Sequence, residues 1–209
     1  IGTATYDNGV SENNYNLIWD DNNGYDGRSV IWLDYTRGPH DYNSNSNNYR
    51  NTWDYQKDWA SNLSSYIINY NYFAEYTVTN EENWRLFKTE DNIDSDINTD
   101  TTVPGDLAGS IFDTSSEMAH LYYIELNNSI NVGITNYDPF DNLLSRVYWS
   151  QTEYEAAQAC TAAWTFLASN GLVGTPCVET AGANPPSNYG MAIRYADVKY
   201  ESSGPPVPE

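Results

Sequence analysis

The chain has 209 residues, of which 29 are acidic and 9 are basic, so its formal net charge is -20. This charge argues against nucleic acid or an anionic membrane surface as a partner, because both are bound through basic patches. Hydrophobic residues make up 40% of the chain and aromatic residues 15%, which is enough for the core of one domain. No apolar run approaches the roughly 20 residues of a membrane-spanning helix, so we expect no membrane span.

The first 36 residues predict strands that are joined as hairpins. Two β-rich runs, residues 17–19 and 29–33, flank residues 20–27, which are dense in turn-forming side chains. Residues 37–51 are polar and of low complexity, and they predict a surface loop.

A helix is predicted to begin at Thr52, which can cap its N-terminus. Trp53, Ala60, Leu63 and Ile67 then recur at helical spacing. The segment that follows, residues 69–83, predicts an aromatic, Asn-rich connection.

A second helix is predicted after an acidic loop at residues 89–109. Thr114 or Ser115 can cap it, and Glu117 suits its first turn. One buried stripe is predicted along it, made of Met118, Leu121, Tyr122 and Leu126.

The C-terminal third is organised around a strand at residues 148–153, where Tyr and Trp adjoin four polar residues. We expect this strand to be buried and to leave the core into a polar loop. Residues 156–169 fit a strand or a helix, and residues 189–195 alternate as a final strand. We therefore expect one domain over residues 1–200, with an N-terminal hairpin, and a Pro-rich tail over residues 201–209.

The two cysteines, Cys160 and Cys177, predict one disulfide. The low Lys content and the acidic, Asn-rich composition favour an exported protein, in which thiols are oxidised. No signal-peptide pattern opens the chain, so we expect Ile1 to follow a removed signal peptide. Closing a loop of this size contributes about 3 kcal/mol of stability in the chain-entropy model.

The most ligand-like spacing is the alternation of Asp94, Asp96, Asn98 and Asp100. Oxygen ligands at alternate positions suit Ca²⁺, which takes several carboxylate and carbonyl oxygens at once. The match to a calcium-binding loop is partial, because Thr99 stands at the position of the turn glycine. A solvated acidic loop is the alternative.

No pattern for catalysis emerges. A histidine can act as a general base, but no activated nucleophile accompanies His40 or His120, and a structural role is expected for His120. Phosphate-binding, dinucleotide-binding, HExxH and CxxC motifs are missing from the sequence. We therefore predict that the protein is not an enzyme.

Six tyrosines between residues 42 and 76 predict a contact surface, since Tyr is enriched at interfaces and stacks on sugars; packing in the core is the alternative. They are Tyr42, Tyr49, Tyr66, Tyr70, Tyr72 and Tyr76. A Pro-rich tail frays unless something holds it. We therefore expect a neighbouring copy to contact the tail residues Pro205, Pro206, Val207 and Pro208.

Several segments, in order, resemble one known family: residues 30–36, 52–54, 59–63, 84–86, 114–122, 139–143, 148–154 and 192–194. They are similar to the exported domain related to the C-terminal domain of the collagen-like adhesin Lcl, in the form found in PEP-CTERM (exosortase-sorted) secreted proteins. The likeness covers about residues 17–198. The chain departs from it at Phe87 and Lys88, which replace the family's proline, and in its cysteine pair.

The resemblance implies an α+β, C-type-lectin-like fold with two helices flanking antiparallel sheets and long loops. It implies surface binding at or outside a bacterial cell, with no catalytic residue. The expected function is that of a surface or matrix subunit that contacts other copies of itself as an oligomer or fibre. The alternative is a monomeric lectin-like module that binds an extracellular glycan.

Overall fold

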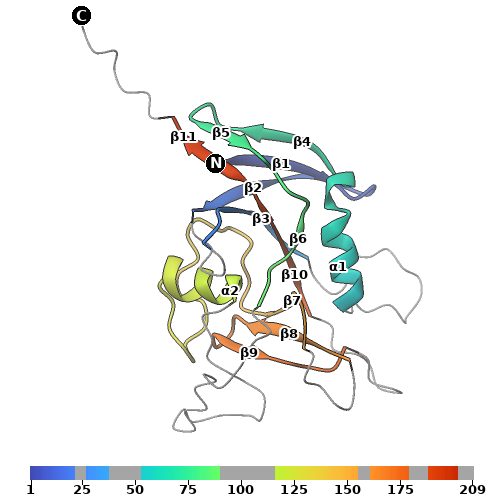
Figure 1. Cartoon of the computed structure of the whole chain (residues 1–209), viewed down its shortest axis with the longest axis vertical. Coiled ribbons are helices and arrows are strands. Elements are labelled where there is room, and N and C mark those ends of the chain that lie inside the picture. The colour runs from blue at the N-terminus through green and yellow to red at the C-terminus, as the bar shows by residue number, and fades with distance from the viewer. Residues whose placement is uncertain (22–26, 38–52, 90–115, 155–160, 179–187, 202–209) are drawn as a thin grey trace, which may run out of the picture.

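The computed structural model describes residues 1–21, 27–37, 53–89, 116–154, 161–178 and 188–201. These residues form a mixed α+β fold in which antiparallel sheets carry two short helices (Figure 1). The elements in order are β1 (Gly2–Asp7), β2 (Glu12–Asp20), β3 (Val30–Arg37), α1 (Trp53–Ser61), η1 (Leu63–Ser65), β4 (Ile67–Tyr72), β5 (Tyr76–Thr79), β6 (Arg85–Leu86), α2 (Glu117–His120), η2 (Leu121–Glu125), β7 (Val147–Tyr154), β8 (Ala162–Leu167), β9 (Leu172–Gly174), β10 (Gly190–Tyr195) and β11 (Asp197–Tyr200).

The largest sheet has six strands in the order β4-β1-β2-β3-β10-β6, and every neighbouring pair is antiparallel. The two β-rich runs predicted near the N-terminus lie in β2 and β3, which pair as the expected hairpin. The predicted final strand is β10, which inserts between β3 and β6. A three-stranded sheet, β7-β8-β9, and a two-stranded one, β11-β5, complete the described strands.

The prediction of a connection over residues 69–83 was wrong, because this segment contains strands. Ile67–Tyr72 forms β4 at the edge of the large sheet, and Tyr76–Thr79 forms β5, which pairs with β11. In β4 the tyrosines alternate with asparagines, so one face is half-buried and the other is exposed. Asn is depleted in strands, which hid this period-two pattern.

Both predicted helices exist, but both are shorter than their apolar patterns. The helix α1 begins at Trp53 and ends at Ser61, and Ile67 already belongs to β4. The helix α2 has one turn and passes directly into the π-helix η2. The proposed caps Thr52, Thr114 and Ser115 lie outside the described residues. The structure places Ser116 at the N-cap position of α2, without a side-chain capping bond.

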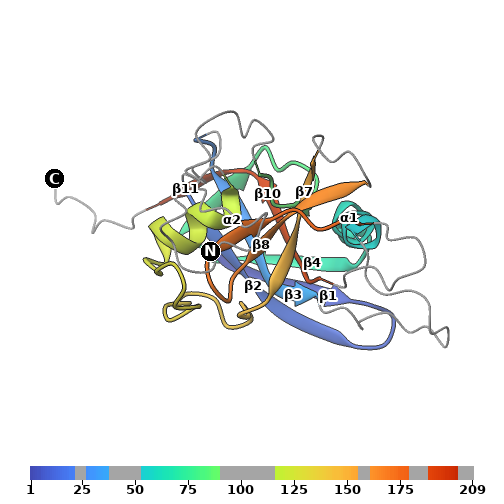
Figure 2. The same cartoon turned by 90° about the horizontal axis from the view of Figure 1, so that it is seen from below.

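The large sheet separates two hydrophobic cores. One core joins Leu17 and Leu33 to Trp53 and Trp59 of α1, and the other joins Trp32 to α2, η2 and the three-stranded sheet. The two helices lie apart, with β7 and β10 between them (Figure 2). The predicted strand at residues 148–153 is β7, with Tyr148, Trp149 and Ser150 buried, and residues 162–167 form the strand β8.

The segments that carry the family resemblance contact one another in this interior. Asp34 accepts hydrogen bonds from the backbone N–H groups of Asp141 (2.8 Å) and Asn142 (3.0 Å). Burial raises the pKa of Asp34, although these hydrogen bonds act in the opposite direction. The indole of Trp53 donates to the carbonyl of Ser150 at 2.7 Å. These contacts give these segments a structural role in the fold.

Candidate functional site

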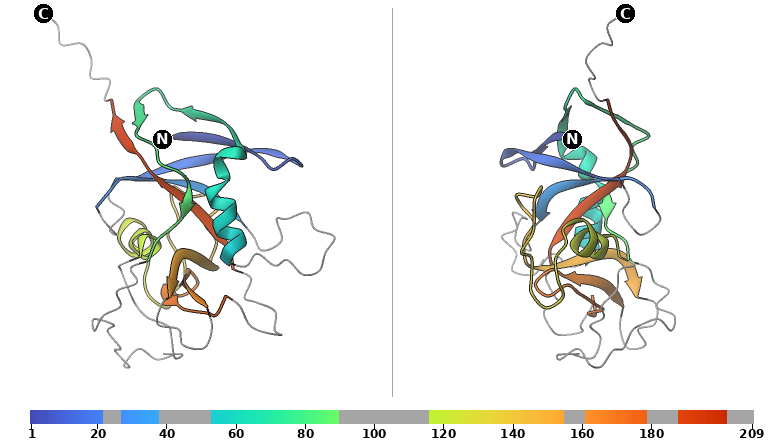
Figure 3. Two further views of the ribbon diagram at one scale, coloured as in Figure 1. Left: turned by 45° about the vertical axis from the view of Figure 1, so that its right-hand side comes forward. Right: turned by 90° about the vertical axis from the view of Figure 1, so that its left-hand side faces the viewer.

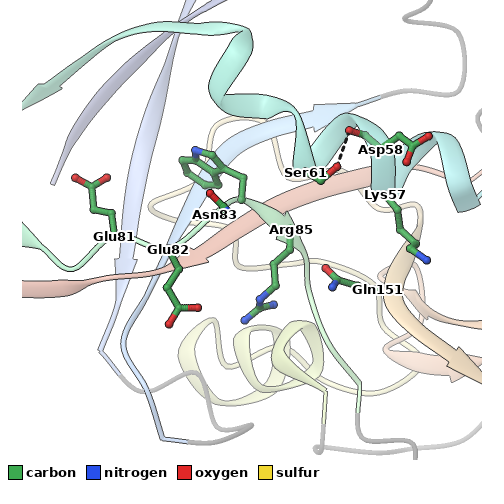
Figure 4. A pocket seen from close by; sticks show the side chains of 9 residues that line it. Lys57, Asp58, Ser61, Glu81, Glu82, Asn83, Arg85 and Gln151 are labelled. Atoms are coloured by element: carbon green, nitrogen blue, oxygen red, sulfur yellow. Dashed lines mark hydrogen bonds between the residues drawn. The ribbon is translucent and has the colours of Figure 1, made fainter.

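A polar pocket of about 590 Å³ opens between α1 and the segment that leads into β6 (Figure 4). It is lined by Lys57, Asp58, Ser61, Glu81, Glu82, Asn83, Trp84, Arg85 and Gln151. Figure 4 shows Lys57, Asp58 and Ser61 on the helix side, with Gln151 coming from β7. The pocket therefore collects groups from three parts of the chain.

Most charged groups of this pocket already have partners within the protein. Arg85 binds both carboxylate oxygens of Glu117, at 2.7 and 2.8 Å, and Ser61 donates to the carbonyl of Asp58 at 3.0 Å. Lys57 lies 3.7 Å from the centre of the Trp53 ring. Within the described part of the chain, the pocket shows no nucleophile hydrogen-bonded to a base. Its amide groups, on Asn83 and Gln151, can form hydrogen bonds to a polar ligand.

A buried arginine organises the tyrosines beside this pocket. Arg194 of β10 is 4% exposed and contacts the faces of Tyr70 and Trp84, with ring centres 4.5 and 4.6 Å from its guanidinium carbon. It pairs with Glu81 and donates to the hydroxyl of Tyr72. Burial raises the pKa of Tyr72 above its usual range. The network therefore ties two tyrosines of β4, at one edge of the large sheet, to β10, which lies next to the strand at the other edge.

The predicted tyrosine surface is only partly a surface. Tyr70 and Tyr72 are half-buried and pack against the core, and Tyr76 contacts the rings of Trp19 and Tyr200. Tyr66 is 36% exposed. The other residues of the predicted interface lie outside the described residues: Tyr42, Tyr49, Pro205, Pro206, Val207 and Pro208.

The outer edge of β4 is a candidate contact surface that the sequence did not indicate as an edge strand. One side of β4 pairs with β1, and no described strand pairs with the other side. Ile68 is 58% exposed, and Phe73, directly after the strand, is 47% exposed. No residue of β4 is charged. The signal in the sequence was an uncharged run of six residues without Gly or Pro, which is typical of segments that pair between chains.

The rows of side chains on the solvent face beside this edge are polar and uncharged. Its cross-strand rows are Asn71–Thr3–Asn16 and Asn69–Thr5–Asn14, carried by β4, β1 and β2. Partners across an antiparallel pair share one face of the sheet. Charged side chains adjoin these rows: Asp7 pairs with Glu12 at the end of the hairpin, and Asn16 donates to the carboxylate of Asp141 at 2.9 Å.

The predicted calcium ligands, Asp94, Asp96, Asn98 and Asp100, lie outside the described residues, so calcium binding there stays a prediction. In the described ranges, the grouping that could hold a metal ion is Asp20, His120 and Glu125, whose potential ligand atoms lie within 4.8 Å of one another. His120 had been expected to be structural.

Cys177 is disulfide-bonded. The sequence contains one other cysteine, Cys160, which lies outside the described residues. Val178, next to Cys177, belongs to the core around α1, so the bond is anchored at one end in the interior.

Comparisons with models of protein families, with curated proteins and with solved structures found no match. Among the described residues, no helix is both long and apolar enough to cross a membrane.

Proposed function

We propose that this chain is a non-enzymatic, extracellular subunit of a bacterial surface or matrix, and that it associates with further copies of itself through the outer edge of β4. The proposal includes the C-type-lectin-like form of the α+β fold. The sequence resemblance described above supports this finer assignment, because its segments pack together in the interior.

The observation that carries the proposal is the outer edge of β4, which no strand among the described residues covers. An edge strand presents unpaired backbone N–H and C=O groups, and proteins that stay monomeric protect such edges with charges, prolines or bulges. The outer side of β4 has neither charge nor proline, and it carries the exposed side chain of Ile68. The register with β1 shifts at Ile68, so β4 is irregular at one position and regular over residues 69–72. Addition of a strand from another molecule would satisfy these backbone groups.

The charge of the chain favours another copy as the partner at this edge. Two molecules with a net charge of -20 repel each other wherever their acidic surfaces meet. The strand β4 carries no charged side chain, and the neighbouring rows are Asn and Thr with one adjoining carboxylate, that of Asp141, so contact at β4 brings few like charges together. Figures 1 and 3 show β4 and β1 at the opposite end of the molecule from the three-stranded sheet.

The disulfide supports an extracellular location. Disulfides persist in oxidising compartments and are rare in the cytosol. The disulfide of Cys177 and the strongly acidic composition both fit an exported protein.

A charged side chain at the β4 edge is expected to prevent assembly. The change Ile68→Lys should weaken self-association about tenfold or more, because it places a strongly hydrated charge beside the pairing backbone. Sedimentation velocity and light scattering over a range of protein concentrations measure the effect. Ile124→Lys is the matched control, since Ile68 and Ile124 are both 58% exposed. A wild-type protein that stays monomeric at every concentration, or two variants that behave alike, would contradict the proposal.

Glycan binding by a monomer is the second candidate, and the polar pocket favours it. Asn83 and Gln151 offer amide groups to hydroxyls, beside Lys57 and the ring of Trp84. A glycan array with monodisperse protein is expected to give specific hits that Gln151→Ala weakens about tenfold, by removal of one amide partner. Hits that Gln151→Ala leaves unchanged would place the glycan elsewhere, and an array without hits would remove this candidate.

A further inference from the structure

Three ends of secondary-structure elements meet beside the large sheet. Asp20 is the last residue of β2, His120 is the last residue of α2, and Glu125 is the last residue of η2. Each brings one potential ligand atom to within 4.8 Å of the other two. Figures 1 and 3 show α2 close to the end of β2, although the two elements are distant in the sequence.

The π-helix explains why His120 and Glu125 share one side of their helix. In an α-helix, residues four apart stack, because the hydrogen bonds join residue i to residue i+4. In η2 the backbone N–H of Leu126 donates to the carbonyl of Leu121, five residues earlier, at 2.9 Å. This wider turn stacks residues five apart, which is the spacing of His120 and Glu125. Short π-helical turns occur frequently at functional sites.

His120 has an unused nitrogen directed at this grouping. Its Nδ1 atom is buried and makes no hydrogen bond, and its side chain is 12% exposed. The nearest carboxylate oxygen, on Glu125, is 4.0 Å away, which is too far for a hydrogen bond. A buried imidazole nitrogen without a partner is unfavourable in a protein alone. A bound cation would give it one.

Asp20 provides a second ligand in a supported position. It is 5% exposed, and one of its oxygens accepts a hydrogen bond from the indole of Trp32 at 3.4 Å. Metal-binding carboxylates are commonly oriented by such outer hydrogen bonds.

We propose that Asp20, His120 and Glu125 bind one divalent transition-metal ion of the zinc class, with water as the fourth ligand. An imidazole with two carboxylates suits zinc, whereas calcium takes six to eight oxygen ligands. Tetrahedral bonds of about 2.1 Å place ligand atoms roughly 3.4 Å apart, so these side chains must close by about 1 Å. The Glu125 side chain is 40% exposed and has room to make this movement. The ion would join the end of β2 to the helical segment and stabilise the fold.

The test uses the full chain after metal removal with a chelator and dialysis. Isothermal titration with Zn²⁺ is expected to show one tight site, and a zinc concentration one hundred times Kd is expected to raise Tm by about 5–10 °C. Glu125→Gln should reduce zinc affinity at least tenfold, because the amide is a poor ligand in place of the carboxylate. His120→Gln should do the same. Glu153→Gln, which changes an exposed glutamate on β7, is the control and should bind zinc as the wild type does.

A measurement of the zinc ligands is needed as well, because the acidic surface can attract zinc without a defined site. X-ray absorption at the zinc edge is expected to show one imidazole nitrogen together with oxygen ligands, and to lose the nitrogen in His120→Gln. Zinc binding of wild-type strength in Glu125→Gln, absence of a tight site in the wild type, or an all-oxygen shell would each overturn the proposal. Glu125 is partly exposed, so its variant is expected to fold even if His120→Gln does not.

Discussion

Glu117→Ala is expected to lower the free energy of unfolding by about 3–5 kcal/mol, because it removes one partner of a buried ion pair. The Glu117 side chain is fully buried, and that of Arg85 is 11% exposed. Burial alone would lower the pKa of Arg85, but the Glu117 carboxylate more than offsets this and the pKa is raised. Glu117 also accepts the backbone N–H of Lys88 at 2.5 Å. The substitution would leave a buried guanidinium and a buried N–H without this acceptor.

Urea denaturation of the wild type and of Glu117→Ala measures this effect. If the dependence of the unfolding free energy on urea concentration is unchanged, the shift in midpoint concentration reports the change in stability. The double change Arg85→Met with Glu117→Leu is the matched control, because replacing both partners of a buried pair by apolar side chains is often nearly neutral. We expect it to recover most of the lost stability. A single Glu117→Ala variant as stable as the wild type would show that the ion pair contributes little.

Arg194→Ala is expected to lower the free energy of unfolding by roughly 2–4 kcal/mol. This effect is somewhat smaller than that of Glu117→Ala, because the partner Glu81 is 29% exposed and can be hydrated. The variant also loses the stacking of the guanidinium on Tyr70 and Trp84, where cation–π contacts contribute about 1–2 kcal/mol each when desolvated. Thermal unfolding should show Tm reduced by about 5–15 °C.

Arg194→Lys separates charge from shape in this network. A lysine keeps the positive charge but lacks the planar guanidinium that stacks on two rings and donates to Tyr72. We expect it to recover less than half of the stability that Arg194→Ala loses. Full recovery by lysine would mean that charge alone holds the network together.

Local sequence patterns predicted the elements whose apolar residues repeat without interruption. The runs in β2 and β3 and the aromatic strand β7 are examples, and so is the start of α1 at Trp53. Local patterns failed to predict the strand β4, because the asparagines that face solvent there are typical of loops. Residues 156–169 stayed open between strand and helix because a buried apolar run fits both.

The contacts that define the candidate sites could not be predicted, because they join residues that are distant in the sequence. Glu117 had been assigned to the first turn of a helix, where it suits the helix dipole, and nothing local indicated its bidentate contact with Arg85. The tyrosines of β4 were predicted to be exposed, but the register with β1 turns their rings towards Arg194. The π-helical turn left no mark in the apolar pattern, since its buried residues also fit an α-helix.

The position of β4 at one end of the large sheet limits what can be built from it. If two molecules pair β4 against β4 in antiparallel fashion, a two-fold axis relates them and each uses the same surface. Such isologous contact closes with two members and leaves no free edge for a third. Growth into a fibre therefore requires a second contact elsewhere on the molecule, and the repeating unit of that fibre would be the dimer.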